Sequence, residues 1–303
     1  IFEGSLWIRL ILESEVHSIK KAVFPVAGFG PRFLPASKSM PKELLPVIDK
    51  PLIQYAVEEA ALIGIKEIIF ITSHTKESIE KHFSSSLELE KKLVASNKNE
   101  YLDKINPSLL RDLTYKFINQ DEQLGLGHAI SLAKNEIKDE PFAVLLPDDL
   151  FISEPSCLKQ LLDIYNEYQK SVIAVNKIDT ANIHKYGVIS SEDNASPYKI
   201  NSIVEKPSAQ EAPSDIAVCG RYILSSDIFE HLENVKKDDS GEIQLTDAIQ
   251  SLLQKEDVMA CLYEGEKYDC GSKKGFIEAT IKLALNDDSI KKDLTSFIRD
   301  IVE

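Results

Sequence analysis

Short apolar runs alternate with amphipathic segments along the first half of the chain. The run 21–27 ends before a glycine and predicts a buried strand, and the runs 67–72 and 114–119 predict two more. Between the first two strands, apolar residues recur at helical spacing and predict a helix over 51–63. A strand, a helix and a second strand at this spacing form a βαβ unit, in which the strands are parallel.

The alternation continues, less regularly, to the end of the chain. Helices are predicted over 76–112, 127–135, 155–169 and 242–254 and in two segments after Lys273. Strands are predicted over 142–146, 171–176, 186–190, 199–205, 216–224 and 258–263. Asp239 and Glu242 have the spacing of a capping box that would open the helix 242–254. This order of elements predicts an α/β fold with a Rossmann-like, doubly wound mixed sheet flanked by helices.

The domain organisation follows from the same pattern. Residues 19–303 show no internal repeat and no clear linker, so they are expected to form one domain. Residues 1–18 are interpreted as an N-terminal extension, either native or left by cloning. In an open α/β sheet, ligands bind beyond the carboxyl ends of the strands. A common crevice is therefore expected beside the residues that follow Ala27, Asn119, Leu146 and Glu205.

The composition limits the classes of partner. The chain has 303 residues, of which 43% are hydrophobic and 28% charged, and its net charge is −14. An acidic surface repels phosphate backbones, so nucleic acids and anionic membranes are poor partners. No apolar run has the length of a membrane span. The four cysteines show no C-x-x-C spacing and are interpreted as reduced thiols, which predicts a cytoplasmic protein.

The loop after the first predicted strand combines glycines with basic side chains. Gly28 and Gly30 form a Gly-x-Gly turn, whose backbone N–H groups can approach phosphate oxygens. Arg32, Lys38 and Lys42 follow in the same loop of an otherwise acidic chain. Taken alone, the Gly-x-Gly is better explained as a tight turn, but the three cations suit a triphosphate.

Two further strand ends carry charged residues. Asp148 and Asp149 follow the strand 142–146, and Glu205 ends the strand 199–205 with Lys206 directly after it. Magnesium in proteins takes one or two carboxylates together with water and substrate phosphates. Each of these pairs, taken alone, is more often an ordinary turn. His128 lies inside a predicted helix, where packing or capping is a better interpretation than general-base catalysis.

Taken together, these strings resemble bacterial UTP–glucose-1-phosphate uridylyltransferases. The resemblance begins with Gly-x-Gly-x-Arg at 28–32, Pro-Lys-Glu at 41–43 and Asp-Lys-Pro-Leu at 49–52. It continues in family order through Gly-Leu-Gly-His-Ala at 125–129, Leu-Pro-Asp-Asp at 146–149, Tyr-Gly-Val at 186–188, Val-Glu-Lys-Pro at 204–207, Gly-Arg-Tyr at 220–222, Gln-Leu-Thr-Asp-Ala at 244–248 and Asp-Cys-Gly at 269–271. The resemblance covers the chain from about residue 19 onward and implies the fold of nucleotide-diphospho-sugar transferases.

The resemblance also implies roles for individual residues. The phosphates of UTP and of the sugar would be held by catalytic residues, namely Arg32, Lys42 and Lys206. Nucleotide contacts would come from Ala27, Gly28, Gly30, Glu43, Gln120 and Gly125. Contacts to the sugar would come from Gly187, Glu205 and Gly220. Mg²⁺, the implied cofactor, would be bound by Asp148 and Asp269. The nucleotide-binding half would span about 19–150 and the sugar-phosphate-binding half about 151–303.

The implied reaction is an in-line attack of glucose 1-phosphate on the α-phosphorus of UTP, which gives UDP-glucose and pyrophosphate. The resemblance further implies a homodimer or homotetramer. Three alternatives stay open: a thymidylyltransferase with different base selection, a guanine or adenine sugar pyrophosphorylase, which the motifs favour less, and a non-catalytic sensor that binds sugar nucleotides without turnover. The sensor is considered because Pro31 stands where the family usually has Thr, and Leu124 where it frequently has Lys.

Overall fold

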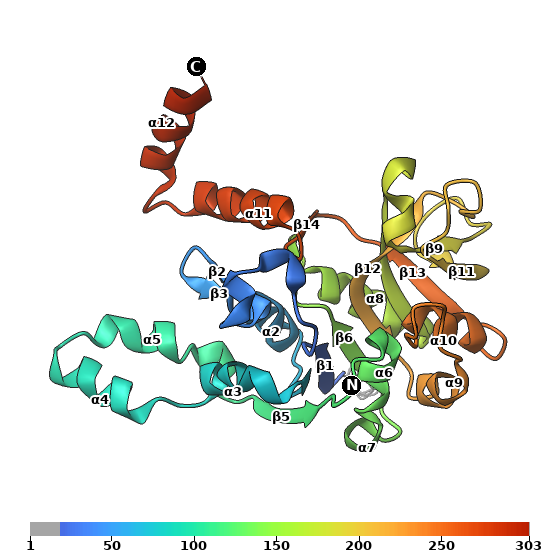
Figure 1. The fold of residues 1–303 in the computed structure, drawn as a ribbon, viewed down its shortest axis with the longest axis horizontal. Coiled ribbons are helices and arrows are strands. Elements are labelled where there is room, and N and C mark those ends of the chain that lie inside the picture. The colour runs from blue at the N-terminus through green and yellow to red at the C-terminus, as the bar shows by residue number, and fades with distance from the viewer. Residues whose placement is uncertain (1–18, 303) are drawn as a thin grey trace, which may run out of the picture.

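A mixed β-sheet forms the centre of the computed structural model, which describes residues 19–302 (Figure 1). Within these residues the strand order is β10-β13-β8-β12-β6-β1-β4-β5, with β9 and β11 attached beside β12. Strand β1 pairs in parallel with β4 and β6, whereas β12 is antiparallel to both β6 and β8. The predicted doubly wound mixed sheet is therefore confirmed. The N-terminal extension expected over 1–18 lies outside the described residues.

Eight of the nine predicted strands are found with small shifts of their ends, whereas the strand predicted over 199–205 is divided into two short strands that pair with different neighbours. The first half of the sheet contains β1 (Lys21–Pro25), β4 (Glu67–Thr72), β5 (Thr114–Asn119) and β6 (Phe142–Leu145). The second half contains β8 (Ser171–Lys177), β9 (Gly187–Ser190), β10 (Tyr198–Lys199), β11 (Ser202–Glu205), β12 (Ile216–Leu224) and β13 (Val258–Leu262). Two short antiparallel pairs lie outside the main sheet: β2 (Pro46–Val47) with β3 (Lys50–Pro51), and β7 (Asp149–Ile152) with β14 (Glu266–Asp269). None of these four strands was predicted.

The helices agree with the prediction less well than the strands. Their bounds are α2 (Leu52–Leu62), α3 (Glu77–Phe83), α4 (Leu87–Ala95), α5 (Leu102–Ile105), α6 (Gly125–Ser131), α7 (Lys134–Ile137), α8 (Cys157–Tyr168), α9 (Ile228–Asn234), α10 (Leu245–Leu252), α11 (Lys273–Asn286) and α12 (Lys291–Val302). The segment 76–112 is not one helix but is divided into three short α-helices and the 3₁₀ helices Asn99–Tyr101 and Ser108–Leu110. Helix α9 was not predicted. None of the helices in the described part of the chain is both long enough and apolar enough to cross a membrane.

The capping box predicted at Asp239 and Glu242 is wrong. Helix α10 begins at Leu245, and its N-cap residue Gln244 makes no side-chain capping hydrogen bond. The neighbouring Asp238 accepts hydrogen bonds from the backbone N–H groups of Ser240 and Glu242, at 2.8 and 2.9 Å. A short polar side chain that bonds to backbone two residues ahead stabilises a turn. The turn at Asp238 therefore replaces the first turn of the predicted helix.

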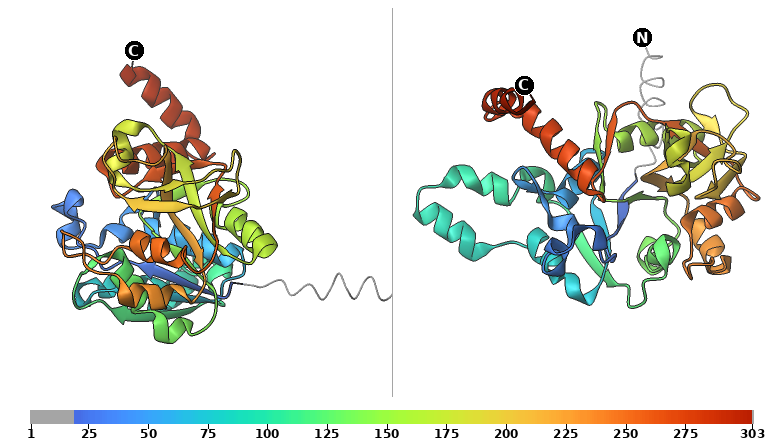
Figure 2. Two further views of the ribbon diagram at one scale, coloured as in Figure 1. Left: turned by 90° about the vertical axis from the view of Figure 1, so that its right-hand side faces the viewer. Right: turned by 45° about the horizontal axis from the view of Figure 1, so that its top comes forward.

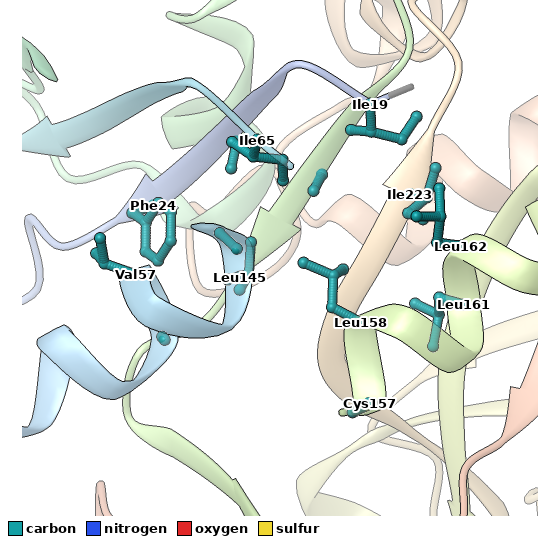
Figure 3. Close-up of a cluster of buried hydrophobic side chains, with 14 of the residues drawn as sticks. Ile19, Phe24, Val57, Ile65, Leu145, Cys157, Leu158, Leu161, Leu162 and Ile223 are labelled. Carbon is teal, nitrogen blue, oxygen red and sulfur yellow. The ribbon is translucent and has the colours of Figure 1, made fainter. Parts of the chain in front are cut away.

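Two apolar layers cover the two faces of the sheet. On one face, Phe24 of β1 packs with residues of α2 and α8, and Figure 3 shows Val57 and Leu158 among them. On the other face, Val23 packs with residues of α6, α9 and α10. Successive side chains of a strand point to opposite faces, so a strand buried on both sides must be apolar throughout. This explains why β1 appears in the sequence as a continuous apolar run.

Two parts of the chain extend away from the sheet. Helices α4 and α5 form an arm at one end, and α12 projects beyond α11 (Figures 1 and 2). Both parts carry large apolar side chains that are exposed, among them Leu87 and Val94 on the arm and Phe297 and Ile301 on α12. Neither part contributes to the two apolar layers of the sheet.

A buried ion pair connects the two halves of the sheet near the turn between β6 and β7. Arg221 of β12 is 1% exposed, and its Nε donates to Glu59 of α2 over 2.8 Å. Its other nitrogens donate to the carbonyl oxygens of Leu146, Asp149 and Gly220. The second carboxylate oxygen of Glu59 accepts the N–H of Leu158 at the start of α8, at 2.8 Å. The Arg221–Glu59 pair and the hydrogen bonds of its two side chains thus hold α2, α8, β12 and the turn 146–149 together.

Removing one partner of this pair should destabilise the fold strongly. Glu59→Ala leaves the Arg221 guanidinium buried without its counter-charge, which costs about 3–5 kcal/mol of unfolding free energy. Urea denaturation followed by circular dichroism measures the loss. Glu230→Ala, which removes a carboxylate that is 66% exposed and paired with Lys255, is the matched control and should change the urea midpoint little. Equal midpoint shifts in both variants would contradict the role given to Glu59.

Candidate active site

One cavity of about 390 Å³ lies beyond the carboxyl ends of the central strands. Its lining includes eight of the residues expected in a site, namely Arg32, Gly125, Asp148, Gly187, Glu205, Lys206, Gly220 and Asp269. They come from the segments after β1, β5 and β6, from β9, from the end of β11 and the residue after it, and from β12 and β14. The expected common crevice is therefore confirmed for the four loops from which it was predicted. Ala27, Gly28, Gly30, Lys42, Glu43 and Gln120 are not part of its lining.

Asp148 and Lys42 form an ion pair at this cavity. The Lys42 Nζ lies 2.6 Å from Asp148 Oδ2. Burial by itself would raise the pKa of Asp148, but the Lys42 ammonium and its hydrogen bond hold that pKa below its ordinary value. Burial would likewise lower the pKa of Lys42, and the carboxylates of Asp148 and Glu43 raise it instead. Both groups therefore carry their charges, and Asp148 is available to a cation that replaces Lys42.

The neighbouring Asp149 is bound differently from Asp148. Its carboxylate lies 3.0 Å from the Nζ of Lys267 and accepts the N–H of Gly220 at 3.3 Å. Lys267 also lies over the ring of Tyr186, at 5.1 Å from the ring centre. Burial raises the pKa of Asp149, and Lys267 opposes this shift. Sequence analysis missed Lys267, although its position two residues before Asp269 puts both on the same side of β14.

The second expected carboxylate, Asp269, lies beside Asp148. It ends β14 directly opposite Asp149 of β7, and its Oδ1 accepts the N–H of Gly271 at 3.0 Å. A Cβ atom placed on Gly271 would lie 3.0 Å from Asp269 Oδ1 and 3.1 Å from Asp148 Oδ2. The two oxygens therefore flank the same small space. Among residues 19–302 no group of three or more His, Cys, Asp or Glu side chains is arranged to hold a metal ion.

Two carboxylates at one edge of a polar cavity fit Mg²⁺ better than a transition metal. Magnesium is bound by one or two carboxylates and completes its coordination with water and phosphate oxygens. Zinc and related metals prefer His and Cys ligands, which this edge of the cavity does not offer in its described lining. Asp148 and Asp269 are thus the residues that could hold Mg²⁺.

Glu205 and Lys206 form a second charged group in the cavity lining. The Lys206 Nζ lies 2.8 Å from Glu205 Oε1, and the Thr246 hydroxyl donates to Glu205 Oε2 over 2.9 Å. A Cβ atom on Gly187 would approach Thr246 Cγ2 to 2.7 Å, so this position requires glycine. Thr246, from the Gln-Leu-Thr-Asp-Ala string, was not expected as a site residue. It orients Glu205 and leaves the Lys206 ammonium half-exposed to the cavity.

The glycine-containing loop is fastened to the sheet by a buried lysine. Glu43 is 1% exposed, and its Oε2 lies 2.8 Å from the Nζ of Lys76, which also donates to the Val26 carbonyl oxygen. Burial raises the pKa of Glu43 and lowers that of Lys76. Glu43 therefore does not face the cavity. It holds the backbone of Lys42 in place, and sequence analysis gave no sign of Lys76.

Gln120 connects the end of β5 to helix α6. Its Nε2 donates to His128 Nδ1 at 2.9 Å and to the Gly125 carbonyl oxygen at 3.4 Å. His128 is the fourth residue of α6, and it holds the Gln120 side chain instead of capping the helix. Gln123 Nε2 donates to the Ala27 carbonyl oxygen at 2.8 Å and so bridges the loops after β1 and β5. Gln120 is thus hydrogen-bonded directly to Gly125, which lines the cavity.

Comparison with known proteins gives a consistent family. The family model described as nucleotidyl transferase matches residues 21–286. A relative named UTP–glucose-1-phosphate uridylyltransferase 2, from Staphylococcus saprophyticus, is 48% identical over 286 residues, which are 94% of this chain and 98% of that protein.

Two similar solved structures are complexes with ligands. A UDP-glucose pyrophosphorylase complexed with UDP-glucose is 42% identical and superposes with a TM-score of 0.81, over 89% of this chain and 100% of the other. A UTP-bound enzyme of the same kind from Acinetobacter baumannii is 38% identical, with a TM-score of 0.85 over 92% and 98% of the two chains. The agreement extends over nearly the whole length of all these proteins.

The close approach at Gly220 is a testable feature of the cavity wall. A Cβ atom there would lie 2.6 Å from Asp149 Oδ2 and 2.7 Å from Leu146 Cβ, in a buried position. Gly220→Ala should therefore displace the turn 146–149 and cost about 1–3 kcal/mol of unfolding free energy. Gly28→Ala is the control, because nothing lies within 4 Å of its Cβ position. Denaturant titration of both variants checks this, and an unchanged Gly220→Ala midpoint would contradict the geometry.

Proposed function

The chain belongs to the nucleotidyl transferase family, and from this premise we propose that it transfers the uridylyl group of UTP to glucose 1-phosphate, giving UDP-glucose and pyrophosphate. The observation that carries the proposal is the composition of one cavity. Five carboxylates line it, among them Asp148 and Asp269, together with three cations, Arg32, Lys185 and Lys206, in a strongly acidic protein. That set suits a triphosphate with its cation and a second, anionic substrate.

The proposed mechanism depends on positioning and charge neutralisation. Arg32 and the N–H groups of the loop 28–32 bind the β- and γ-phosphates, and Lys42 binds the α-phosphate after leaving Asp148. Lys206 binds the phosphate of glucose 1-phosphate, and Glu205 accepts hydrogen bonds from the sugar hydroxyls. An oxygen of the sugar phosphate attacks the α-phosphorus, and the bond to the pyrophosphate oxygen breaks. The attacking oxygen is already ionised at neutral pH, so no general base is required.

The proposed cofactor is Mg²⁺, held by Asp148 and Asp269. When bound, it supplies positive charge that offsets the negative charge of the two substrates. Other side chains hold Asp149 and the loop of Lys42 in position. Lys267 and Gly220 hold Asp149, so that Asp149 does not compete with Asp148 for a cation. Glu43 and Lys76 fix the loop that carries Lys42.

Release of pyrophosphate tests the function directly. The purified chain is incubated with Mg²⁺, glucose 1-phosphate and either UTP, dTTP, CTP or ATP, and pyrophosphate is measured by a coupled assay. UTP should give the highest kcat/KM. A preference for dTTP would identify a thymidylyltransferase instead. If UDP-glucose binds but no nucleotide releases pyrophosphate, the chain is a sensor. Pro31 is the reason to test for this outcome, because proline offers the phosphates no N–H.

The remaining expectations are proposed on the same basis. The nucleotide-binding half is about 19–150 and the sugar-phosphate-binding half about 151–303 of a single domain. A homodimer or homotetramer is supported by apolar side chains exposed on projecting elements, such as Phe297 and Ile301 of α12 at 61% and 64%. A cytoplasmic location is supported by the four cysteines, which are all buried and unpaired.

Asp148→Asn should separate catalysis from nucleotide binding. The amide keeps the shape of the carboxylate but not its charge, so we expect kcat to fall by at least about a hundredfold with little change in UTP affinity. Steady-state rates across an Mg²⁺ titration and calorimetric titration of UTP check this. Asp149→Asn is the control: it loses its pair with Lys267, and it should lower stability without changing the Mg²⁺ dependence. Near-normal kcat of Asp148→Asn at limiting Mg²⁺ would exclude Asp148 as a ligand.

Lys206→Met should affect one substrate and not the other. The methionine keeps the length of the stem and removes the charge, and the lost contact of about 1.5–3 kcal/mol corresponds to about a ten- to hundredfold loss of kcat/KM for glucose 1-phosphate. UTP affinity should stay nearly unchanged, and Lys206→Arg, which keeps the charge, should lose less. A large loss of UTP affinity in Lys206→Met would place Lys206 on the other substrate.

A further inference from the structure

We propose that His128 is a positioning residue that fixes the orientation of the Gln120 amide, and that this orientation makes the site select uracil over cytosine. The inference rests on the proposed function, in which Gln120 contacts the nucleotide base. It goes further by naming the residue that decides which end of the amide the base meets.

Gln120 occupies a fixed position at the end of β5. Its backbone N–H donates to the Thr72 carbonyl oxygen at 2.8 Å, and the residue is 5% exposed. Its side-chain nitrogen lies 2.9 Å from His128 Nδ1 and 3.4 Å from the Gly125 carbonyl oxygen. These are the two hydrogen-bond partners of the Gln120 amide within the described part of the chain, and both lie on its nitrogen.

The two partners determine the amide orientation by their chemistry. A carbonyl oxygen only accepts hydrogen bonds, so the amide must turn its NH₂ group, not its oxygen, toward Gly125. The same NH₂ group then donates to His128, whose Nδ1 must be the unprotonated ring nitrogen while Nε2 carries the proton. The contact to His128 is the shorter of the two. Without it, only one long hydrogen bond would oppose rotation of the amide by half a turn.

Helix α6 is itself held in place, so its histidine cannot follow a rotated amide. The Gly127 N–H donates to the Ile243 carbonyl oxygen at 2.8 Å, and the Ile243 N–H donates to the Leu124 carbonyl oxygen at 2.7 Å. Gly125 and Gly127 pack so closely against the segment of Ile243 that a Cβ on either would approach its backbone oxygen to less than 3 Å. His128 is therefore a rigid acceptor for Gln120.

The orientation of the amide determines which of its atoms a bound base would contact. With NH₂ turned to α6, Gln120 offers Oε1 to a ligand, and Oε1 can only accept a hydrogen bond. Uracil presents a donor at N3, whereas cytosine presents an acceptor at N3, so Oε1 attracts the first and repels the second. Thymine has the same N3–H as uracil. This contact therefore separates UTP from CTP but cannot separate UTP from dTTP.

The test compares affinities for UTP, dTTP and CTP, measured by calorimetric titration in the presence of Mg²⁺ so that turnover is not needed. His128→Phe keeps a ring of similar size but has no acceptor, and the preference for UTP over CTP should fall about threefold to tenfold. The UTP to dTTP ratio should stay unchanged. His128→Asn should keep most of the preference for UTP, because its Oδ1 can accept near the position of Nδ1.

Gln120→Leu separates this inference from the proposed function. If Gln120→Leu lowers the UTP to CTP ratio and His128→Phe does so only in the presence of Gln120, the two residues act as one unit. If Gln120→Leu lowers the ratio and His128→Phe does not, the positioning role is wrong although Gln120 contacts the base. If the ratio is unchanged in Gln120→Leu, both the base contact and this inference are wrong. Equal losses for UTP, dTTP and CTP in His128→Phe would indicate a purely structural role and overturn the inference.

Discussion

The buried ion pair between Arg221 and Glu59 is the interaction on which the site depends. A guanidinium that is 1% exposed is costly unless each of its donors has a partner, and Arg221 has Glu59 and three carbonyl oxygens. Two of those oxygens belong to Leu146 and Asp149, which flank the turn that carries Asp148. Phe151 also lies against the guanidinium, 4.3 Å from its central carbon. These contacts hold the turn that carries Asp148 in place.

Because this turn is held in place, the charged side chains next to it have defined partners. Asp149 also lines the cavity, but it is held by Lys267 and Gly220, whereas Asp148 lies beside Asp269 and is paired with Lys42. Lys42 neutralises Asp148 in the structure, and Glu43 and Lys76 hold Lys42 in reach. A preorganised arrangement of this kind reduces the reorganisation that the reaction requires. It also explains how a protein of net charge −14 forms a site for anionic substrates.

The sequence was sufficient for the features that depend on local pattern. Buried strands appeared as apolar runs because both faces of the sheet are covered, and the site loops appeared because they follow those strands. Features that depend on distant partners were missed. Glu59, Lys76 and Lys267 acquire their roles from residues far away in sequence, and β7 and β14 are short strands that pair with each other. The capping box failed because Asp238 forms a competing turn.

In the proposed reaction, the Arg221–Glu59 pair positions Asp148 for the metal and the nucleotide. The most direct test is the affinity of Mn²⁺ for the protein–UTP complex, measured by electron paramagnetic resonance in Glu59→Gln, a variant that keeps the shape of the carboxylate and removes its charge. In variant protein shown to be folded by circular dichroism, we expect Mn²⁺ affinity and turnover to fall together, by about tenfold or more, because a small displacement of a catalytic group is costly. Wild-type Mn²⁺ affinity and turnover in the folded variant would contradict this role of the pair.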